Sequence, residues 1–575
     1  MSGPNDLHIV PSMIKQLGQQ HDDGLYPPGK RILNHGPGAP PQAGSLAAPK
    51  PQTQTQTQNM SSSVARTLAQ KRGMSMRCGI SVPVGLLLIS VLIPLGQPAR
   101  AQAVPAAPPV ATVVASAPAS APQPQHKDPL RLLDYWLDAQ VAYDHVPAVS
   151  AGVVIGQSLV WSRGYGFADT ARLVPVSADT VYSICSISKL FNAVAVMQLW
   201  ETGKLGLDDD LGKYLPAFKM ARSDPDSGPI SLRSLLTHSS GLPRETLANP
   251  WQPPEFVAPG RNQALADLAR QKTLMRVSDH YQYSNLGMML LGEVIAAASG
   301  QPYADYVQQH LLQPLKLTET RPYLPKDLLG TRLPAGHSSI KCDGTRDVLR
   351  PFDMTGLTAA AGYTYTVADL ARFASWQFRL AGKGGSEVLK VATLRDMQRV
   401  QWTDPDGKNT WGFGFAVSRE GANTVVSHSG ICPGYNTALA LALKDEVAVI
   451  ALANANGAGP YTRQMRQIML KGLRLPVATV QAGKPDLEVF AGRYAGQPWN
   501  SEIVIVLWGK DLTLLTLPSR DPASEMQVLR HVSGDVFRMV RGDDSLGTEV
   551  AFDRDASNAV MGYRIWGYRV SKLAP

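Results

Sequence analysis

Strand-like segments lie near both ends of the main folded part of the chain, and helical segments lie between them. Residues 148–169 read as a β-hairpin around Gly156-Gln157-Ser158. Helical apolar patterns dominate residues 186–315. Short strand-like runs then return, at residues 423–430, 435–443 and 446–454. This order predicts one sheet built from both ends of the domain, with helices packed around it.

Composition divides the 575-residue chain into five segments. We read residues 1–73 as a disordered leader or gene-model extension, 74–101 as a signal peptide, 102–128 as an Ala/Pro-rich linker, 129–475 as the main domain, and 486–575 as a small all-β domain. Helical patterns at residues 130–141 and 464–473 lie near the two ends of the main domain. The C-terminal segment contains several short strand signals and no helical pattern of comparable length.

Residues 74–101 have the order of a secretory signal peptide. Basic residues precede an apolar run from Ile80 to Leu95, and small residues follow it at Ala101 and Ala103. A transmembrane anchor is the alternative, but the run is shorter than the ~20 residues that a span needs and contains two prolines. We therefore expect translation to start at Met74 or Met76, cleavage to leave no stable membrane span, and the protein to be periplasmic or extracellular.

The formal net charge of +9 does not indicate a nucleic-acid partner, because most of it lies in the leader. Residues 1–101 contribute +6 of this charge, and the rest of the chain is nearly balanced and contains no long basic run.

After cleavage three cysteines remain, Cys185, Cys342 and Cys432. At most one bridge can form among them, and the sequence alone does not choose the pair.

The segment Ser186-Ile187-Ser188-Lys189 opens an apolar helix, and this places an amine and a hydroxyl one turn apart. A serine at a helix start benefits from unpaired backbone N–H groups, and a lysine whose pKa is lowered by burial can take its proton. The structural alternative is an N-cap serine with a snorkelling lysine. A second S-x-x-K, at Ser338 and Lys341, is not followed by a helical pattern, so we interpret it as a loop coincidence.

Two further motifs are uninformative alone but gain weight together. Tyr283-Ser284-Asn285 is the only Y-x-N in the chain and precedes an apolar helix. A phenol beside an ammonium can have its pKa depressed and share the role of base, and an amide can orient the lysine. His428-Ser429-Gly430 ends a strand-like run, and its glycine would let a substrate approach the strand edge. Each motif alone is more often structural.

The order and spacing of these motifs resemble the serine β-lactamase and penicillin-binding-protein superfamily. The Y-x-N form is similar to the class C β-lactamase branch and its esterase and D-aminopeptidase relatives. Further matching phrases are ISLRSLLTHSSGLP, LGKYLPAF, AAAGYTYTVADLARF and WGFGF. The resemblance covers residues 130–475 and implies an α/β (α+β) fold, with an antiparallel sheet flanked by helices and a helical subdomain. The stretch FAGRYAG is similar to the small C-terminal β domain that some members append.

The resemblance also implies roles for individual residues. Ser186 would be the acylated nucleophile, and Lys189 and Tyr283 would be the general base and acid. Asn285 would position the substrate, and the strand residues His428, Ser429 and Gly430 would line it. The backbone N–H groups of Ser186 and Ile431 would form the oxyanion hole. The mechanism would be two acyl transfers without a metal or cofactor, acting on a small-molecule or peptide substrate that includes peptidoglycan-derived peptides.

His428 departs from the family pattern, since β-lactamases and D-Ala-D-Ala carboxypeptidases usually have lysine there to hold a substrate carboxylate. A partly charged histidine should recognise a carboxylate less well, which favours esters and D-amino-acid amides and predicts weak turnover of β-lactams.

In this architecture Cys185 and Cys432 could lie near one another. A catalytically silent protein that binds cell-wall peptides is the main alternative. An α/β-hydrolase is disfavoured because no G-x-S-x-G elbow is present.

Overall fold

A computed structural model describes residues 126–459, 461–475, 486–498 and 500–574. The expected leader, signal peptide and nearly all of the linker therefore lie outside the described residues. Within the described ranges, no helix is both long enough and apolar enough to cross a membrane.

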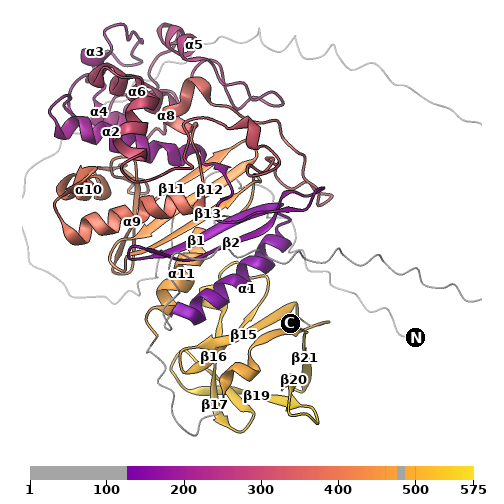
Figure 1. Ribbon diagram of the computed structural model, residues 1–575. Coiled ribbons are helices and arrows are strands. Elements are labelled where there is room, and N and C mark those ends of the chain that lie inside the picture. Colours follow the sequence, from indigo (N-terminus) through magenta and orange to yellow (C-terminus); the bar gives the residue numbers. More distant parts are fainter. Residues whose placement is uncertain (1–125, 460, 476–485, 499, 575) are drawn as a thin grey trace, which may run out of the picture. The chain divides into compact units, whose positions relative to one another are not determined.

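The main domain is built on a nine-stranded antiparallel sheet in the order β3-β2-β1-β13-β12-β11-β10-β9-β8 (Figure 1). The N-terminal strand β1 (Ala148–Ile155) pairs directly with the late strand β13 (Val447–Ala453). The prediction of one sheet from both ends of the domain is thus confirmed. The other strands are β2 (Ser158–Asp169), β3 (Val174–Pro175), β8 (Trp402–Thr403), β9 (Thr410–Trp411), β10 (Ala416–Glu420), β11 (Asn423–Cys432) and β12 (Tyr435–Ala442).

Both faces of this sheet are covered, which explains the continuous apolar run of β13. Its alternate residues enter two cores: Ala448, Ile450 and Leu452 face the larger core, and Val447, Val449 and Ala451 face the smaller one. Helix α9 (Val367–Lys383) contacts β1 and β13 from the first side. Helices α1 (Lys127–Tyr143) and α11 (Thr462–Gly472) cover the second side.

A helical layer is centred on α2 (Ser188–Glu201), which contacts α6 (Asn285–Ser299) and α8 (Thr358–Ala361). Almost every α2 residue is buried, so this helix lies inside the domain rather than on its surface. Around it lie α3 (Leu211–Tyr214), α4 (Leu232–Leu236), α5 (Arg261–Ala266), α7 (Tyr303–Val307) and α10 (Val391–Gln398) (Figure 1).

The C-terminal segment forms a closed eight-stranded barrel, in agreement with the predicted all-β domain. Its core combines aliphatic residues with five aromatic ones, Phe490, Tyr494, Phe537, Phe552 and Tyr563. The strands are β14 (Gly492–Ala495), β15 (Glu502–Trp508), β16 (Asp511–Thr516), β17 (Gln527–Ser533), β18 (Val536–Val540), β19 (Leu546–Arg554), β20 (Val560–Ile565) and β21 (Tyr568–Lys572).

The barrel shares a core with the main domain. Val504 and Leu515 of the barrel belong to the same apolar cluster as Trp136 of α1 and Met465 of α11. The indole Nε1 of Trp136 also donates a hydrogen bond of 2.8 Å to the carbonyl of Ser519. The two domains are therefore coupled through α1 and α11, on the face of the sheet opposite α9.

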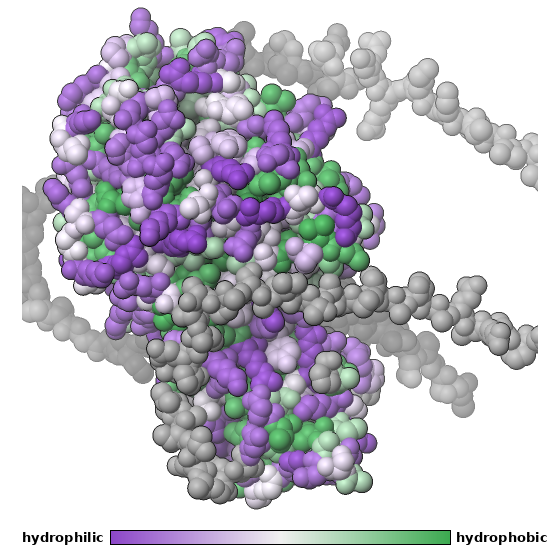
Figure 2. All heavy atoms as spheres, viewed as in Figure 1, coloured by the Kyte–Doolittle hydropathy of each residue, from purple (hydrophilic) through white to green (hydrophobic). Residues whose placement is uncertain are grey.

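On the side of the molecule drawn in Figure 2, polar residues are widespread and apolar residues form smaller patches between them.

Candidate active site

Ser186 and Lys189 lie where the sheet meets the buried helix α2. Ser186 occupies the short 3₁₀ turn η2 (Cys185–Ile187), and α2 begins two residues later. The Nζ atom of Lys189 lies 3.0 Å from the Oγ atom of Ser186. Lys189 is fully buried, whereas Ser186 keeps 9 % of its surface exposed. Ser186 thus keeps a small exposed fraction, and Lys189 keeps none.

Three oxygen atoms lie within hydrogen-bond distance of the Nζ atom of Lys189. Besides Ser186, its Nζ atom has two partners, Oδ1 of Asn285 at 2.7 Å and the carbonyl of Ala360 at 2.7 Å. Both are acceptors, so an uncharged amine can donate its two N–H groups to them and keep its lone pair for the hydroxyl proton of Ser186. A charged lysine would instead donate to all three oxygens.

Electrostatics favour this uncharged form. Burial lowers the pKa of Lys189 well below its usual value, the carboxylate of Glu245 opposes this shift, and the guanidinium of Arg244 adds to it. An uncharged amine can act as a general base, and an ammonium cannot.

Tyr283 is the second partner of the serine, but its pKa moves opposite to the direction expected from a neighbouring ammonium. The Nζ atom of Lys189 lies 4.9 Å from the centre of the Tyr283 ring. Burial raises the pKa of Tyr283, while a hydrogen bond with Ser186 and the charge of Arg244 lower it only partly. The expected depression does not occur because burial outweighs the hydrogen bond with Ser186 and the charge of Arg244. Tyr283 therefore keeps its proton and suits the role of general acid.

Asn285 begins helix α6 and connects Lys189 to a carboxylate. Its side-chain amide accepts from Lys189 and donates to Oε1 of Glu245 at 2.7 Å. The side chain of the preceding Ser284 caps the helix by accepting from the N–H of Gly287. This cap fixes the start of α6 and, with it, the direction of the Asn285 side chain.

His238 and Arg244 enclose the Tyr283 ring. The His238 ring lies 4.3 Å from it, and Nδ1 of His238 accepts from the N–H of Ser284 at 3.2 Å. Burial lowers the pKa of His238 well below its usual value, which keeps this nitrogen an acceptor. The guanidinium of Arg244 lies 5.0 Å from the ring centre with 57 % of its side chain exposed. It is a cation at the accessible side of the phenol.

His428 lies on strand β11 and is neutral. Burial, followed by the charge of Lys189, lowers the pKa of His428 to about 3. Its Nδ1 lies 2.7 Å from the carbonyl of Ser429, which fixes the proton on Nδ1 because a carbonyl only accepts. At neutral pH this residue thus contributes no positive charge for a substrate carboxylate.

The strand edge beyond His428 is open. Strand β10 pairs with β11 only as far as Ala416↔Ser427. In the antiparallel ladder, alternate residues direct their N–H and C=O groups to opposite neighbours, and Asn423, Val425 and Ser427 direct theirs toward β10. The N–H of Ile431 points the same way, past the end of β10. It therefore has no ladder partner on β10 within the described residues, as the expected role of oxyanion donor requires.

The other two strand residues differ from their expected positions. The side chain of Ser429 is exposed on the face opposite His428, so its contribution at this edge is through the backbone. Gly430 was expected to make room for a substrate, but the carbonyl of Ile184 fills that space: a Cβ atom there would lie 1.9 Å from its oxygen. The strand also continues to Cys432 rather than ending at residue 430.

A disulfide joins Cys185, which precedes Ser186, to Cys432, which follows Ile431. The third cysteine of the described chain, Cys342, is exposed and unpaired. The sequence left this pairing open.

The second S-x-x-K has none of these features. Ser338 lies in an exposed loop, and Nζ of Lys341 binds Oδ1 of Asp347 at 2.9 Å instead of the serine. Its interpretation as a coincidence is consistent with this geometry.

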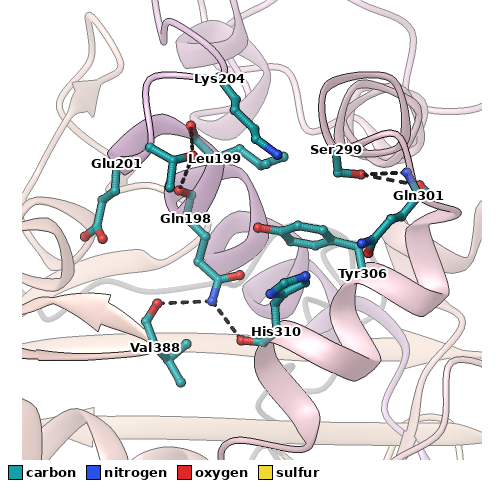
Figure 3. A pocket seen from close by; sticks show the side chains of 10 residues that line it. Gln198, Leu199, Glu201, Lys204, Ser299, Gln301, Tyr306, His310 and Val388 are labelled. Atoms are coloured by element: carbon teal, nitrogen blue, oxygen red, sulfur yellow. Dashed lines mark hydrogen bonds between the residues drawn. The ribbon is translucent and has the colours of Figure 1, made fainter.

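A surface pocket lies at the other end of α2 (Figure 3). Within it, Nε2 of Gln198 donates to the carbonyls of His310 and Val388 and so ties α2 to its neighbours. The one serine of its lining, Ser299, forms hydrogen bonds with the backbone of Ala296 and Gln301. The residues that line the pocket are Gln198, Leu199, Glu201, Thr202, Lys204, Ser299, Gln301, Tyr306, His310 and Val388.

Sequence reasoning missed Glu245, Arg244, His238 and the carbonyl of Ala360. His238 and Ala360 lie inside the quoted phrases ISLRSLLTHSSGLP and AAAGYTYTVADLARF, where the resemblance gave them no role. Glu245 and Arg244 follow the first phrase directly. Charged residues after a glycine-proline turn usually lie at the surface, so no local signal distinguished them.

Comparison with known proteins agrees with this geometry. A family model described as Beta-lactamase matches residues 133–473. "Protein flp" of Staphylococcus aureus (strain N315) is 24% identical over 338 residues, or 57% of this chain and 64% of that protein. "Beta-lactamase-like protein 2" of Dictyostelium discoideum is 28% identical over 302 residues, or 51% of this chain and 53% of that protein. The matched regions thus span less than two thirds of these relatives.

Two solved structures share the fold at low identity. The octameric penicillin-binding protein homologue from Pyrococcus abyssi has a TM-score of 0.52 and 22% identity, covering 77% of this chain and 100% of that one. EstCE1, a hydrolase with promiscuous acyltransferase activity, has a TM-score of 0.52 and 20% identity, covering 60% and 99%. Since the family model matches more than half of the chain and the fold agrees, this protein belongs to the Beta-lactamase family.

Proposed function

We propose that the protein is a serine hydrolase that cleaves esters or amides through an acyl-enzyme on Ser186. The observation that carries the proposal is the contact of 3.0 Å between Ser186 Oγ and a buried Lys189 whose two N–H donors already have acceptors. A silent binding protein has no use for a desolvated amine aimed at a hydroxyl.

The proposed reaction has two acyl transfers. Ser186 Oγ attacks the substrate carbonyl carbon while its proton passes to Nζ of Lys189. The N–H groups of Ser186 and Ile431 bind the oxyanion, and such a donor typically contributes about 3 kcal/mol to transition-state stabilisation. Tyr283 donates a proton to the leaving oxygen or nitrogen as the C–O or C–N bond breaks, and the proton on Lys189 restores the phenol. Water then attacks the ester in the same way and releases Ser186.

We propose that substrates without a carboxylate at the β11 strand are preferred, which means carboxylesters and D-amino-acid amides, with β-lactams turned over weakly. Support comes from the neutral state of His428 in the position where carboxylate-binding relatives place lysine. Peptidoglycan-derived peptides are candidates among the amides.

A panel of four substrates tests this proposal: a short-chain nitrophenyl ester, a D-alanyl anilide, a chromogenic cephalosporin and a D-Ala-D-Ala peptide. We expect turnover of the ester or the anilide to exceed that of the two carboxylate-bearing compounds. Equal or greater turnover of the cephalosporin would contradict the proposed preference. If none of the four is cleaved and none acylates Ser186, the alternative of a silent cell-wall binder is favoured.

We also propose that the protein acts outside the cytoplasm. The signal-like segment supports this, and so does the Cys185–Cys432 bridge, because disulfides persist mainly in oxidising compartments. Expression of the chain from Met74 with a C-terminal epitope, followed by cell fractionation, should give a shortened protein in the periplasm or medium. A full-length protein in the cytoplasm would contradict it.

A further inference from the structure

The disulfide flanks both proposed oxyanion donors. Cys185 immediately precedes Ser186, and Cys432 immediately follows Ile431, although the two cysteines are 247 residues apart in the sequence. Their Cα atoms lie 5.8 Å apart, so the bond joins the nucleophile turn η2 directly to the end of β11.

The backbone at Cys185 is held in an unfavourable conformation. Its φ angle is +51°, in the left-handed region that glycine adopts readily and other residues rarely do. Such a conformation persists only when the surroundings impose it, and it is typical of functional sites. It occurs here one residue before the serine that must present both its hydroxyl and its N–H to a substrate.

Non-covalent contacts reinforce the same junction. The missing side chain of Gly430 lets the carbonyl of Ile184 approach the strand, and Oγ1 of Thr437 donates to that carbonyl at 3.0 Å. Both cysteines are buried. The hydroxyl of Ser183 lies 3.9 Å from the sulfur of Cys185 and 3.7 Å from the sulfur of Cys432. The bond is therefore enclosed by protein atoms rather than exposed to solvent.

We propose that the Cys185–Cys432 disulfide is a positioning element that holds the N–H groups of Ser186 and Ile431 in the geometry of the oxyanion hole. The inference rests on the proposed function. Without the bond, the turn and the strand end would still pack. The positions of the two N–H groups relative to each other would no longer be fixed by a covalent link. A displacement of about 1 Å in such a site typically costs about 10²-fold in rate.

The rate of Ser186 phosphonylation by a fluorophosphonate tests this inference, since it needs no knowledge of the natural substrate. Two double variants separate the bond from the backbone conformation: Cys185→Ala with Cys432→Ala, and Cys185→Gly with Cys432→Ala. Glycine accepts the positive φ angle, so the second variant removes the bond while relieving the conformational cost. Cys342→Ser is the matched control for loss of a cysteine elsewhere.

We expect both double variants to react about 10²-fold more slowly than wild type, with circular dichroism unchanged and with Cys342→Ser at the wild-type rate. A glycine variant that reacts at the wild-type rate would overturn the inference, because the backbone conformation alone would then suffice. If either variant fails to fold, peptide mapping of the unreduced wild type decides: recovery of Cys185 and Cys432 as separate alkylated peptides also overturns it. A wild type that forms no adduct at Ser186 overturns the proposed function together with this inference.

Discussion

Nζ of Lys189 lies 3.0 Å from Oγ of Ser186, and the lysine is fully buried while the serine keeps 9 % of its surface exposed. This arrangement favours the uncharged form of the amine, which can act as a base, because burial removes the water that would stabilise its charge. Neighbouring groups fix the positions of these two side chains. Asn285 and the carbonyl of Ala360 accept hydrogen bonds from the amine, and Tyr283 lies beside the hydroxyl.

Replacement of Lys189 should abolish most of the activity. We expect Lys189→Ala to lower kcat by about 10²–10⁴-fold, the usual contribution of a general base, with a smaller effect on KM. Lys189→Arg should be as inactive, since a guanidinium stays protonated. Steady-state kinetics with the best ester of the panel checks this, and an active arginine variant would show that a positive charge, not a base, is required.

The two charges next to the site should shift the pH profile in opposite directions. Arg244 lowers and Glu245 raises the pKa of Lys189. Removing the cation in Arg244→Gln should therefore raise this pKa and move the acidic limb of kcat/KM to higher pH. Glu245→Gln should move the limb to lower pH while its amide can still bind Asn285. Shifts in the same direction would exclude Lys189 as the group that titrates.

His428 should make the fold sensitive to acid. Its pKa falls from about 6.5 in the unfolded chain to about 3 in the fold, so the unfolded state binds a proton first as the pH falls. The native state should lose about 2 kcal/mol relative to the unfolded state between pH 7 and pH 5 from this group alone. Urea unfolding at the two pH values should show that His428→Gln removes this loss, while the exposed-site control His310→Gln retains it.

The junction between the barrel and the main domain should contribute to stability. Trp136→Phe keeps most of the apolar contact but removes the hydrogen bond to Ser519 and leaves a buried carbonyl without that donor. We expect a loss of about 1–3 kcal/mol in the free energy of unfolding and unchanged kcat, because the indole lies on the opposite side of the sheet from Ser186. Trp200→Phe, at a partly exposed position, is the control and should have little effect.

Much of the fold was predictable because it depends on local periodicity. The hairpin at residues 148–169 and the three late strands have alternating or continuous apolar patterns, and their positions in the chain require a shared sheet. The contact of Ser186 with Lys189 was predictable because it lies within one helical turn.

The rest of the site depends on contacts between residues far apart in the chain. Nothing near Glu245 indicates that it lies beside Asn285, forty positions away, and Cys185 could not be matched to Cys432 from the sequence alone. The reversed pKa shift of Tyr283 has the same origin, since its burial depends on His238 and Trp411 from separate segments. The role of Gly430 was misjudged because the packing of Ile184 against it is also a tertiary contact.

The most direct test of the account is to locate a covalent adduct after incubation with a fluorophosphonate. Intact-mass analysis should show one addition per molecule, and peptide mapping should place it on Ser186 in wild type and in Ser338→Ala. In Ser186→Ala both the adduct and hydrolysis of the ester should be absent. An adduct on another residue, or an active Ser186→Ala variant, would contradict the assignment of Ser186 as the nucleophile.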